Sequence, residues 1–212
     1  MVGDRVRRLV VGAAIIVAAC GGPPETPVPV AAPGSAGAAA PAPIRPFLES
    51  HEQYYDIEGS TTGALREQMH RLGPRDGDAA RDALTVWTID WTYAEARTAD
   101  GCGLRDVKVT LTLSTTLPRW VPAAGTPAHV VDSWKTYFQH VRQHEAGHRA
   151  IAEQNARDLL AALSSMRAAT CQQVMDAASR TGERIVAEGR AKNRAYDVQT
   201  KHGQTQGVVL PP

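Results

Sequence analysis

The residues of this chain best suited to chemistry are two histidines and a glutamate in the segment His144-Glu145-Ala146-Gly147-His148. Four residues advance an α-helix by about 400°, so His144 and His148 share one helix face and can bind the same metal ion. Imidazole is a common zinc ligand, and a glutamate directly after the first histidine can act as general base towards a metal-activated water. The spacing therefore predicts a zinc site with Glu145 as the catalytic base.

This zinc site needs a third ligand, because a catalytic zinc takes three protein ligands and leaves the fourth position to water. Glu153 and Asp158 follow on the same helix, but the first points away from the metal and the second is too far along the axis. The third ligand must therefore come from later in the chain. Four later residues are candidates: Glu183, Glu188, Asp197 and His202.

Two segments alternate between apolar and polar side chains, as strands with one buried face do. In residues 85–93 the apolar positions include Trp87 and Ile89, and residues 107–113 repeat the pattern. We expect two neighbouring antiparallel strands, with a shorter strand at residues 53–58. We also expect strand 107–113 to lie at a sheet edge, where it could align an extended peptide.

The apolar period becomes helical from about residue 127. One long helix is expected to reach residue 163 and to carry both histidines, and a second is expected over about 166–193. If the second helix folds back antiparallel, residues near 183–188 would lie level with the histidines. The elements together predict an α+β, zincin-like fold over residues 47–212, with a small antiparallel sheet packed on two long helices.

The chain begins with a pattern typical of an exported lipoprotein. Residues 1–19 are predicted to be a signal peptide, because a positive start precedes an apolar run too short to cross a bilayer as a helix. The run ends in Val17-Ala18-Ala19-Cys20, which is similar to a bacterial lipobox, so Cys20 is the expected lipidation site. An ordinary signal peptide that contains a cysteine is the alternative.

Residues 20–46 are dominated by Pro, Ala and Gly and hold almost no large apolar side chain, so we expect a disordered, semi-rigid linker. The predicted location is therefore the cell envelope, with a lipid anchor either on the periplasmic face of the outer membrane or at the cell surface.

Two further cysteines, Cys102 and Cys171, lie in the part expected to fold. An even number of cysteines in an exported protein predicts a disulfide, and two unpaired buried thiols are the alternative. Closing the long loop between Cys102 and Cys171 would stabilise the fold by about 4 kcal/mol on the chain-entropy model.

The charges of the chain do not indicate a nucleic-acid partner. The 23 basic and 22 acidic side chains give a net charge of +1, and they are interspersed along the sequence. Because nucleic-acid binding depends on a concentrated positive surface, we expect no such partner.

Several segments resemble the DUF922 family, which comprises bacterial proteins of unknown function that are predicted to be secreted zinc-dependent proteases. The similarity covers roughly residues 52–208. Its carrying segments are Tyr54-Tyr55-Asp56-Ile57-Glu58-Gly59, the strand from Thr85 to Tyr93, Leu117-Pro118-Arg119-Trp120, the histidine helix, and the tail from Tyr196 to Gly207.

This resemblance implies a zinc peptidase and bears on the third ligand. The tail pattern Tyr-Asp-x-x-Thr-x-His-Gly looks like part of the family pattern, so the resemblance favours His202 as the third ligand. The alternative is that Asp197 binds the metal instead or orients a histidine. The predicted function is hydrolysis of peptide or protein substrates. The alternatives are a non-enzymatic zinc-binding envelope lipoprotein and an amidase acting on cell-wall peptides.

Overall fold

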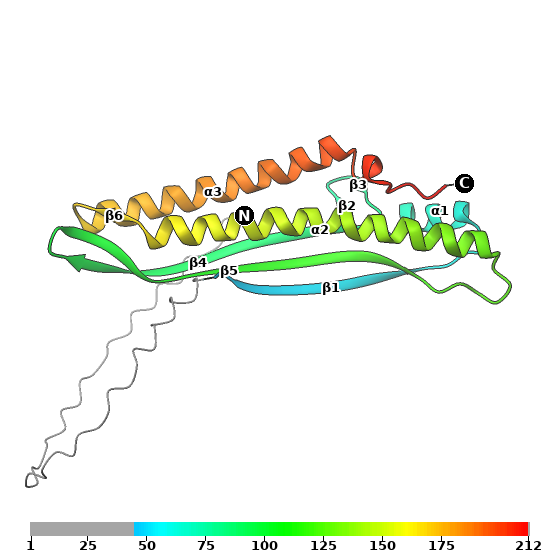
Figure 1. The fold of residues 1–212 in the computed structure, drawn as a ribbon, viewed down its shortest axis with the longest axis horizontal. Coiled ribbons are helices and arrows are strands. Elements are labelled where there is room, and N and C mark those ends of the chain that lie inside the picture. Colours follow the sequence, from blue (N-terminus) through cyan, green and yellow to red (C-terminus); the bar gives the residue numbers. More distant parts are fainter. Residues whose placement is uncertain (1–44, 212) are drawn as a thin grey trace, which may run out of the picture. The chain divides into compact units, whose positions relative to one another are not determined.

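A computed structural model of the chain describes residues 45–211 (Figure 1). The predicted signal peptide, the lipidation site Cys20 and residues 20–44 of the predicted linker lie outside the described residues. Within residues 45–211, no helix is long and apolar enough to cross a membrane.

One face of a mixed sheet packs against two long helices, which confirms the expected α+β fold (Figure 1). The sheet order is β1-β5-β4, and a two-residue strand, β6, pairs with the beginning of β5. The bounds are Phe47–Ile57 for β1, Leu84–Thr98 for β4, Gly101–Trp120 for β5 and Arg167–Ala168 for β6.

The strands differ from the sequence expectation in length and in order. Strands β4 and β5 form the predicted antiparallel pair, but β1 pairs with β5 in parallel, so the sheet is not antiparallel throughout. The prediction that strand 107–113 lies at an edge is wrong, because it is part of the central strand β5. Most of β1 is exposed on both faces, so its sequence carries no alternation from which the pairing could be derived.

A short helix and a small hairpin connect β1 to β4. Helix α1 (Thr62–Leu72) begins where Thr61 accepts a hydrogen bond from the Ala64 backbone, and it ends at Gly73. The polar segment after it forms a hairpin of β2 (Arg75–Asp76) and β3 (Ala79–Ala80).

The two long helices lie side by side over the sheet (Figure 1). Helix α2 (Ala128–Ser164) has nearly the predicted bounds. Helix α3 (Cys171–Thr200) begins and ends later than expected, since it is capped by Thr170 and continues until Lys201 adopts a left-handed conformation. Asp197 therefore belongs to a helix and not to an irregular tail. A short helix η1 (Gln204–Gln206) follows.

Two apolar clusters hold α2 in place, one towards each of its ends. The first half of α2 contributes Val130, Trp134, Tyr137 and Val141 to a cluster with β1, α1 and the end of β5. The second half contributes Ala152, Ala156, Leu159, Leu160 and Leu163 to a cluster with β4, β5 and α3. The same inward stripe carries buried His144 and His148 between the clusters, so polar groups occupy a gap in an otherwise apolar interface.

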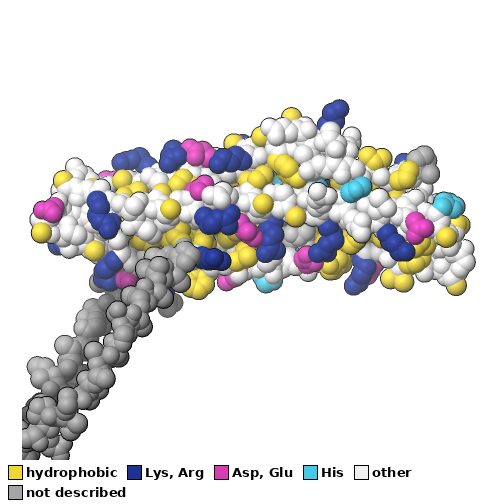
Figure 2. All heavy atoms as spheres, in the orientation of Figure 1, with side chains coloured by type: hydrophobic (Ala, Val, Ile, Leu, Met, Phe, Trp, Pro, Cys, Tyr) yellow, Lys and Arg dark blue, Asp and Glu magenta, His cyan; other side chains and the backbone are white. Residues whose placement is uncertain are grey.

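The predicted disulfide is present between Cys102 at the beginning of β5 and Cys171 at the beginning of α3. It joins the sheet to the second long helix at the end of α3 remote from Asp197. Figure 2 shows basic and acidic side chains interspersed with hydrophobic ones over one face of the domain, so no single sign of charge dominates that face.

Candidate metal centre

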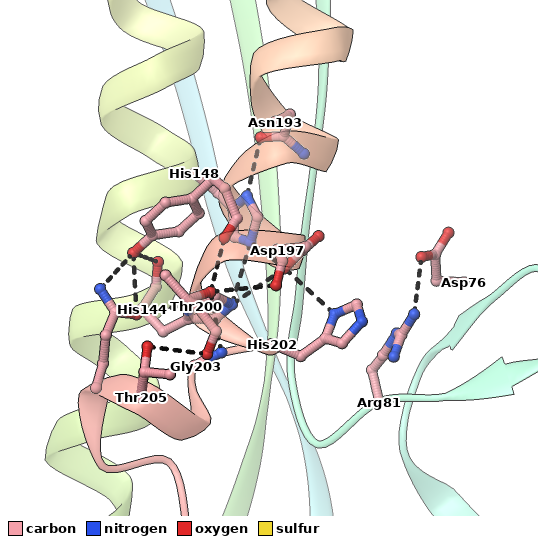
Figure 3. A network of polar contacts seen from close by, with 12 residues as sticks. Asp76, Arg81, His144, His148, Asn193, Asp197, Thr200, His202, Gly203 and Thr205 are labelled. Carbon is pink, nitrogen blue, oxygen red and sulfur yellow. Dashed lines mark hydrogen bonds and ion pairs between the residues drawn. The ribbon is translucent and has the colours of Figure 1, made fainter.

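Three possible metal ligands converge where the end of α3 crosses the middle of α2 (Figure 3). The Nε2 atoms of His144 and His148 lie 3.3 Å apart. Oδ1 of Asp197 lies 3.3 Å from the first of these atoms and 3.2 Å from the second. The three atoms therefore form a nearly equilateral triangle.

The size of this triangle fits a small metal ion. Zinc bonds of about 2.0–2.1 Å at tetrahedral angles hold neighbouring ligand atoms roughly 3.3–3.4 Å apart. The donor set of two imidazoles and one carboxylate suits zinc and also other transition metals. On distance and on donor chemistry, the three side chains could hold one metal ion.

Hydrogen bonds on the far side of each imidazole direct its other nitrogen towards this triangle. Nδ1 of His144 lies 2.9 Å from Oε1 of Gln206, and Nδ1 of His148 lies 2.9 Å from Oδ1 of Asn193. An amide oxygen only accepts, so each Nδ1 carries a hydrogen, and in the neutral form of each ring Nε2 is the atom left to bind a metal. Such partners fix the tautomer that a metal ligand requires.

An aromatic ring from α3 packs on both histidines. The Tyr196 ring stacks on the His144 ring at 5.0 Å with an interplanar angle of 13° and meets the His148 ring edge-on at 4.9 Å. A Cβ atom on Gly147 would lie 2.2 Å from the Tyr196 hydroxyl oxygen. The absence of a side chain at Gly147 is therefore what admits this ring.

The same contacts set the charge states of the cluster. Partial burial alone would raise the pKa of Asp197, but hydrogen bonds from His144 and His148 outweigh it and hold that pKa well below its usual range. Burial acts to lower the pKa of His148, yet its hydrogen bonds with Asp197 and Asn193 raise it above the ordinary value. Asp197 is thus held as a carboxylate, the form that binds metal ions.

Glu145 lies beside this cluster and is 6% exposed. Burial raises its pKa above the ordinary glutamate value, although a hydrogen bond with Thr85 of β4 and the nearby histidines act in the opposite direction. Its Oε2 atom has no hydrogen-bond partner among the described residues. A buried oxygen atom without a hydrogen-bond partner destabilises the folded state, so its presence here points to a ligand or a reaction at this place.

The cluster forms the floor of a cleft of about 580 Å³. One wall is the segment from the β2–β3 hairpin to the beginning of β4, and the other is the last part of α3. The first wall is anchored at Asp82, whose carboxylate accepts a hydrogen bond from Tyr137 and whose backbone oxygen accepts one from Tyr55, both at 2.6 Å. A substrate could therefore reach the possible metal site through this cleft.

The model of a family described as "Bacterial protein of unknown function (DUF922)" matches residues 52–203. The chain belongs to the DUF922 family. The segment matched to DUF922 contains both histidines, Glu145 and Asp197. No curated protein and no solved structure matches the chain, so the family supplies no activity and the site must be interpreted from its own geometry.

In this DUF922 chain, Asp197 joins His144 and His148 in the group of three possible metal ligands, and the favoured His202 is not part of that group. His202 follows the end of α3 in a turn where residues 201–203 all have positive φ angles. Its side chain is 47% exposed, lines the cleft, and places Nδ1 3.4 Å from Oδ1 of Asp197. His202 therefore contacts the possible ligand Asp197 and is itself partly exposed to solvent.

The other two candidates, Glu183 and Glu188, lie away from the cluster. Glu188 pairs with Arg184 at 2.7 Å, and Glu183 lines a separate hollow further along α3. The helices are antiparallel as expected, but residues 165–170, which include β6, separate them. That connection shifts the register, so residues 193–197 rather than 183–188 lie level with the histidines.

Sequence reasoning missed three residues that orient the ligands: Asn193, Tyr196 and Gln206. The only available signal was the helical spacing from Asn193 to Asp197, which places both side chains on one face of α3. Gln206 gave no comparable signal, because it lies beyond the end of α3, in η1, and only the folding of that segment brings it to His144.

Proposed function

We propose that this protein is a zinc-dependent peptidase that hydrolyses peptide bonds with Glu145 as general base. The observation that carries this proposal is the unpartnered Oε2 atom of Glu145, buried beside three convergent ligand atoms on the floor of a cleft. A glutamate in this relation to two histidines on one helix is the arrangement of zinc peptidases.

The ligand arrangement favours a catalytic rather than a structural site. Structural zinc sites are closed by four protein ligands, whereas catalytic sites use three and leave one position open. Here three side chains converge, and all three line the cleft. When bound, zinc would lower the pKa of a water molecule to about 7 and polarise the substrate carbonyl.

Glu145 would move the proton that hydrolysis requires. Its Oε2 accepts a proton as the water oxygen attacks the carbonyl carbon, and then returns it to the leaving nitrogen as the C–N bond breaks. A general base works best when its pKa approaches the working pH. Burial shifts the pKa of Glu145 in that direction, although a hydrogen bond with Thr85 and the nearby histidines oppose part of the shift.

The free edge of β4 would align an extended substrate. Strand β4 is the outer strand of its sheet, and residues 84–87 line the cleft beside the ligands. A peptide can add to such an edge through main-chain hydrogen bonds. This assigns to β4 the role that the sequence had suggested for residues 107–113.

We further propose export and attachment to the envelope through a lipid on Cys20. The Cys102–Cys171 disulfide supports export, because disulfides persist in oxidising compartments. Cys20, the proposed acceptor of the lipid, directly follows the predicted signal peptide, and the lipobox-like pattern Val17-Ala18-Ala19-Cys20 supports its role.

The decisive experiment is Glu145→Gln, which keeps the size of the side chain and removes the base. We expect cleavage of an unfolded protein substrate to fall by at least 10²-fold, with zinc content and thermal stability unchanged. Glu153→Gln is the matched control on the same helix, where Glu153 pairs with Arg149 at 2.8 Å outside the cleft.

Three outcomes would contradict the proposal in different ways. A zinc-loaded wild type that cleaves nothing in a broad peptide library would leave a non-enzymatic metal protein. Cleavage confined to cell-wall peptides would indicate the amidase. A purified protein that holds iron or no metal would refute the assignment of zinc, since two histidines and a carboxylate also bind iron(II).

A further inference from the structure

Two arginines of α3 stand on the wall of the cleft, one and two turns before Asp197. Arg190 and Arg194 both line the metal-containing cleft, and both also line a neighbouring hollow of about 330 Å³ with Trp91, Val186 and Ala187. The pair therefore marks the place where the two depressions meet between α3 and β4.

Neither guanidinium group has a hydrogen-bond or ion-pair partner within residues 45–211, and both side chains are exposed. Their neighbours are paired. Arg184 binds Glu188 at 2.7 Å on the same helix, and Arg81 on the opposite wall binds Asp76 at 3.4 Å (Figure 3). The two arginines thus contribute two uncompensated positive charges to the cleft.

The acidic groups of the cleft do not neutralise this pair. Asp197 is engaged by three histidines, and the Asp82 carboxylate accepts a hydrogen bond from Tyr137. Glu183 lines the neighbouring hollow but lies seven residues before Arg190, about 10 Å along the helix axis, beyond the spacing at which helix side chains pair.

We propose that Arg190 and Arg194 bind a carboxylate of the peptide substrate, so that the cleft selects peptides carrying negative charge near the cleaved bond. This inference rests on the proposed function, since it assumes that a peptide occupies the cleft. Arginine suits the task, because its planar donors match the two oxygens of a carboxylate.

The spacing on α3 predicts where the carboxylate lies. Arg194 and Arg190 precede Asp197 by three and seven residues, hence by about 4.5 and 10.5 Å along the helix. An extended peptide advances about 3.3 Å per residue. The recognised carboxylate therefore lies about one to three residues from the scissile bond, as an acidic side chain or as the C-terminal carboxylate of a short substrate.

Peptide binding tests this inference separately from catalysis. The first series consists of fluorescent decapeptides with an amidated C-terminus, in which either Glu or Gln is placed at each position in turn. The second series is one pair of peptides without acidic side chains, which differ only in having a free or an amidated C-terminus. Affinity would be measured by fluorescence anisotropy with the full chain carrying Glu145→Gln, so that bound peptide persists. The test variant adds R190Q and R194Q, and the matched control adds R180Q and R184Q, which removes equal charge from α3 outside both depressions.

We expect the carboxylate peptides to bind about tenfold more tightly than their amides, as two partly exposed charged pairs would provide, and to lose this preference at 1 M salt. The preference should disappear in the R190Q/R194Q protein and persist in the control. The peptide series that shows it identifies an acidic side chain or the C-terminus as the source.

The inference would be overturned if carboxylate and amide peptides bound equally well, or if the R190Q/R194Q protein kept the preference. It would also be overturned if none of the peptides bound. If the carboxylate preference depends on both arginines but the wild-type protein cleaves no peptide, this inference is retained and the proposed peptidase activity is refuted.

Discussion

The substitution Gly147→Ala separates two accounts of why a glycine lies inside α2, the helix that carries the two histidines of the candidate metal centre. Alanine is the better helix former by about 1 kcal/mol, so α2 by itself would gain stability. The structure predicts the opposite sign. The new Cβ would lie 2.2 Å from the hydroxyl oxygen of Tyr196 and 2.4 Å from its Cζ, distances that no relaxed contact allows.

The cost follows from what Tyr196 must give up when its ring moves. The ring stacks on His144, and its hydroxyl group contacts Gln206 and the backbone oxygen of His144. An aromatic contact stabilises by about 0.5–1.5 kcal/mol and a hydrogen bond by about 1 kcal/mol. After the helix gain is subtracted, we expect a net loss of about 1–2 kcal/mol in the free energy of unfolding.

The metal site should weaken together with the fold. Gln206 accepts the hydrogen bond from Nδ1 of His144, so displacement of Tyr196 loosens the group that orients this ligand. Loss of such support lowers metal affinity by about 10–100-fold. Urea denaturation of the metal-free protein measures the first effect, and competition with a chromophoric chelator measures the second.

Two controls identify the steric cause. Gly63 lies in α1, where a Cβ atom would make only an ordinary contact of 3.9 Å with the Thr61 hydroxyl oxygen, so Gly63→Ala should leave stability unchanged or raise it by up to about 1 kcal/mol. In a Tyr196→Ala background, Gly147→Ala should likewise be neutral or stabilising. A Gly147→Ala protein that is more stable than the wild type and binds zinc equally well would refute the reasoning.

Three further predictions concern the third ligand, the oriented imidazole and the disulfide. Asp197→Asn should abolish stoichiometric zinc binding while His202→Ala retains it, and elemental analysis showing the reverse would return the ligand role to His202. Asn193→Ala removes the 2.9 Å partner of the His148 imidazole and should weaken zinc binding about 10–100-fold, measured by chelator competition; unchanged affinity would contradict its orienting role. Replacing Cys102 and Cys171 by serine should lower the free energy of unfolding by about 4 kcal/mol in urea denaturation, and a change below 1 kcal/mol would show that the loop is constrained without the bridge.

The local part of the fold was predictable from periodicity and caps. The apolar spacing indicated α2 almost to its ends, and the alternation around Trp87 and Ile89 indicated the β4–β5 pair. The start of helix α1 carries such a local signal too, because Thr61, a residue type that commonly caps helices, caps it. These signals are local because the hydrogen bonds and buried faces that they report lie within one element or one hairpin.

The pairing of β1 and the register of the long helices were not predictable in this way. Strand β1 is exposed on both faces for most of its length, so no pattern distinguished a parallel partner from an antiparallel one. Residues 165–170 connect α2 to α3, and they include β6, which pairs with β5. Which residues of α3 lie level with the histidines of α2 therefore depends on a pairing with a distant strand.

The sequence by itself determined the half of the candidate metal centre that one helix builds. His144, Glu145 and His148 follow from helix geometry, because 3.6 residues per turn bring positions four apart onto one face. The tertiary structure decided the other half. Asp197 rather than His202 meets the histidines because the packing of α3 against α2 sets which residues lie level, and that packing depends on contacts far apart in the chain.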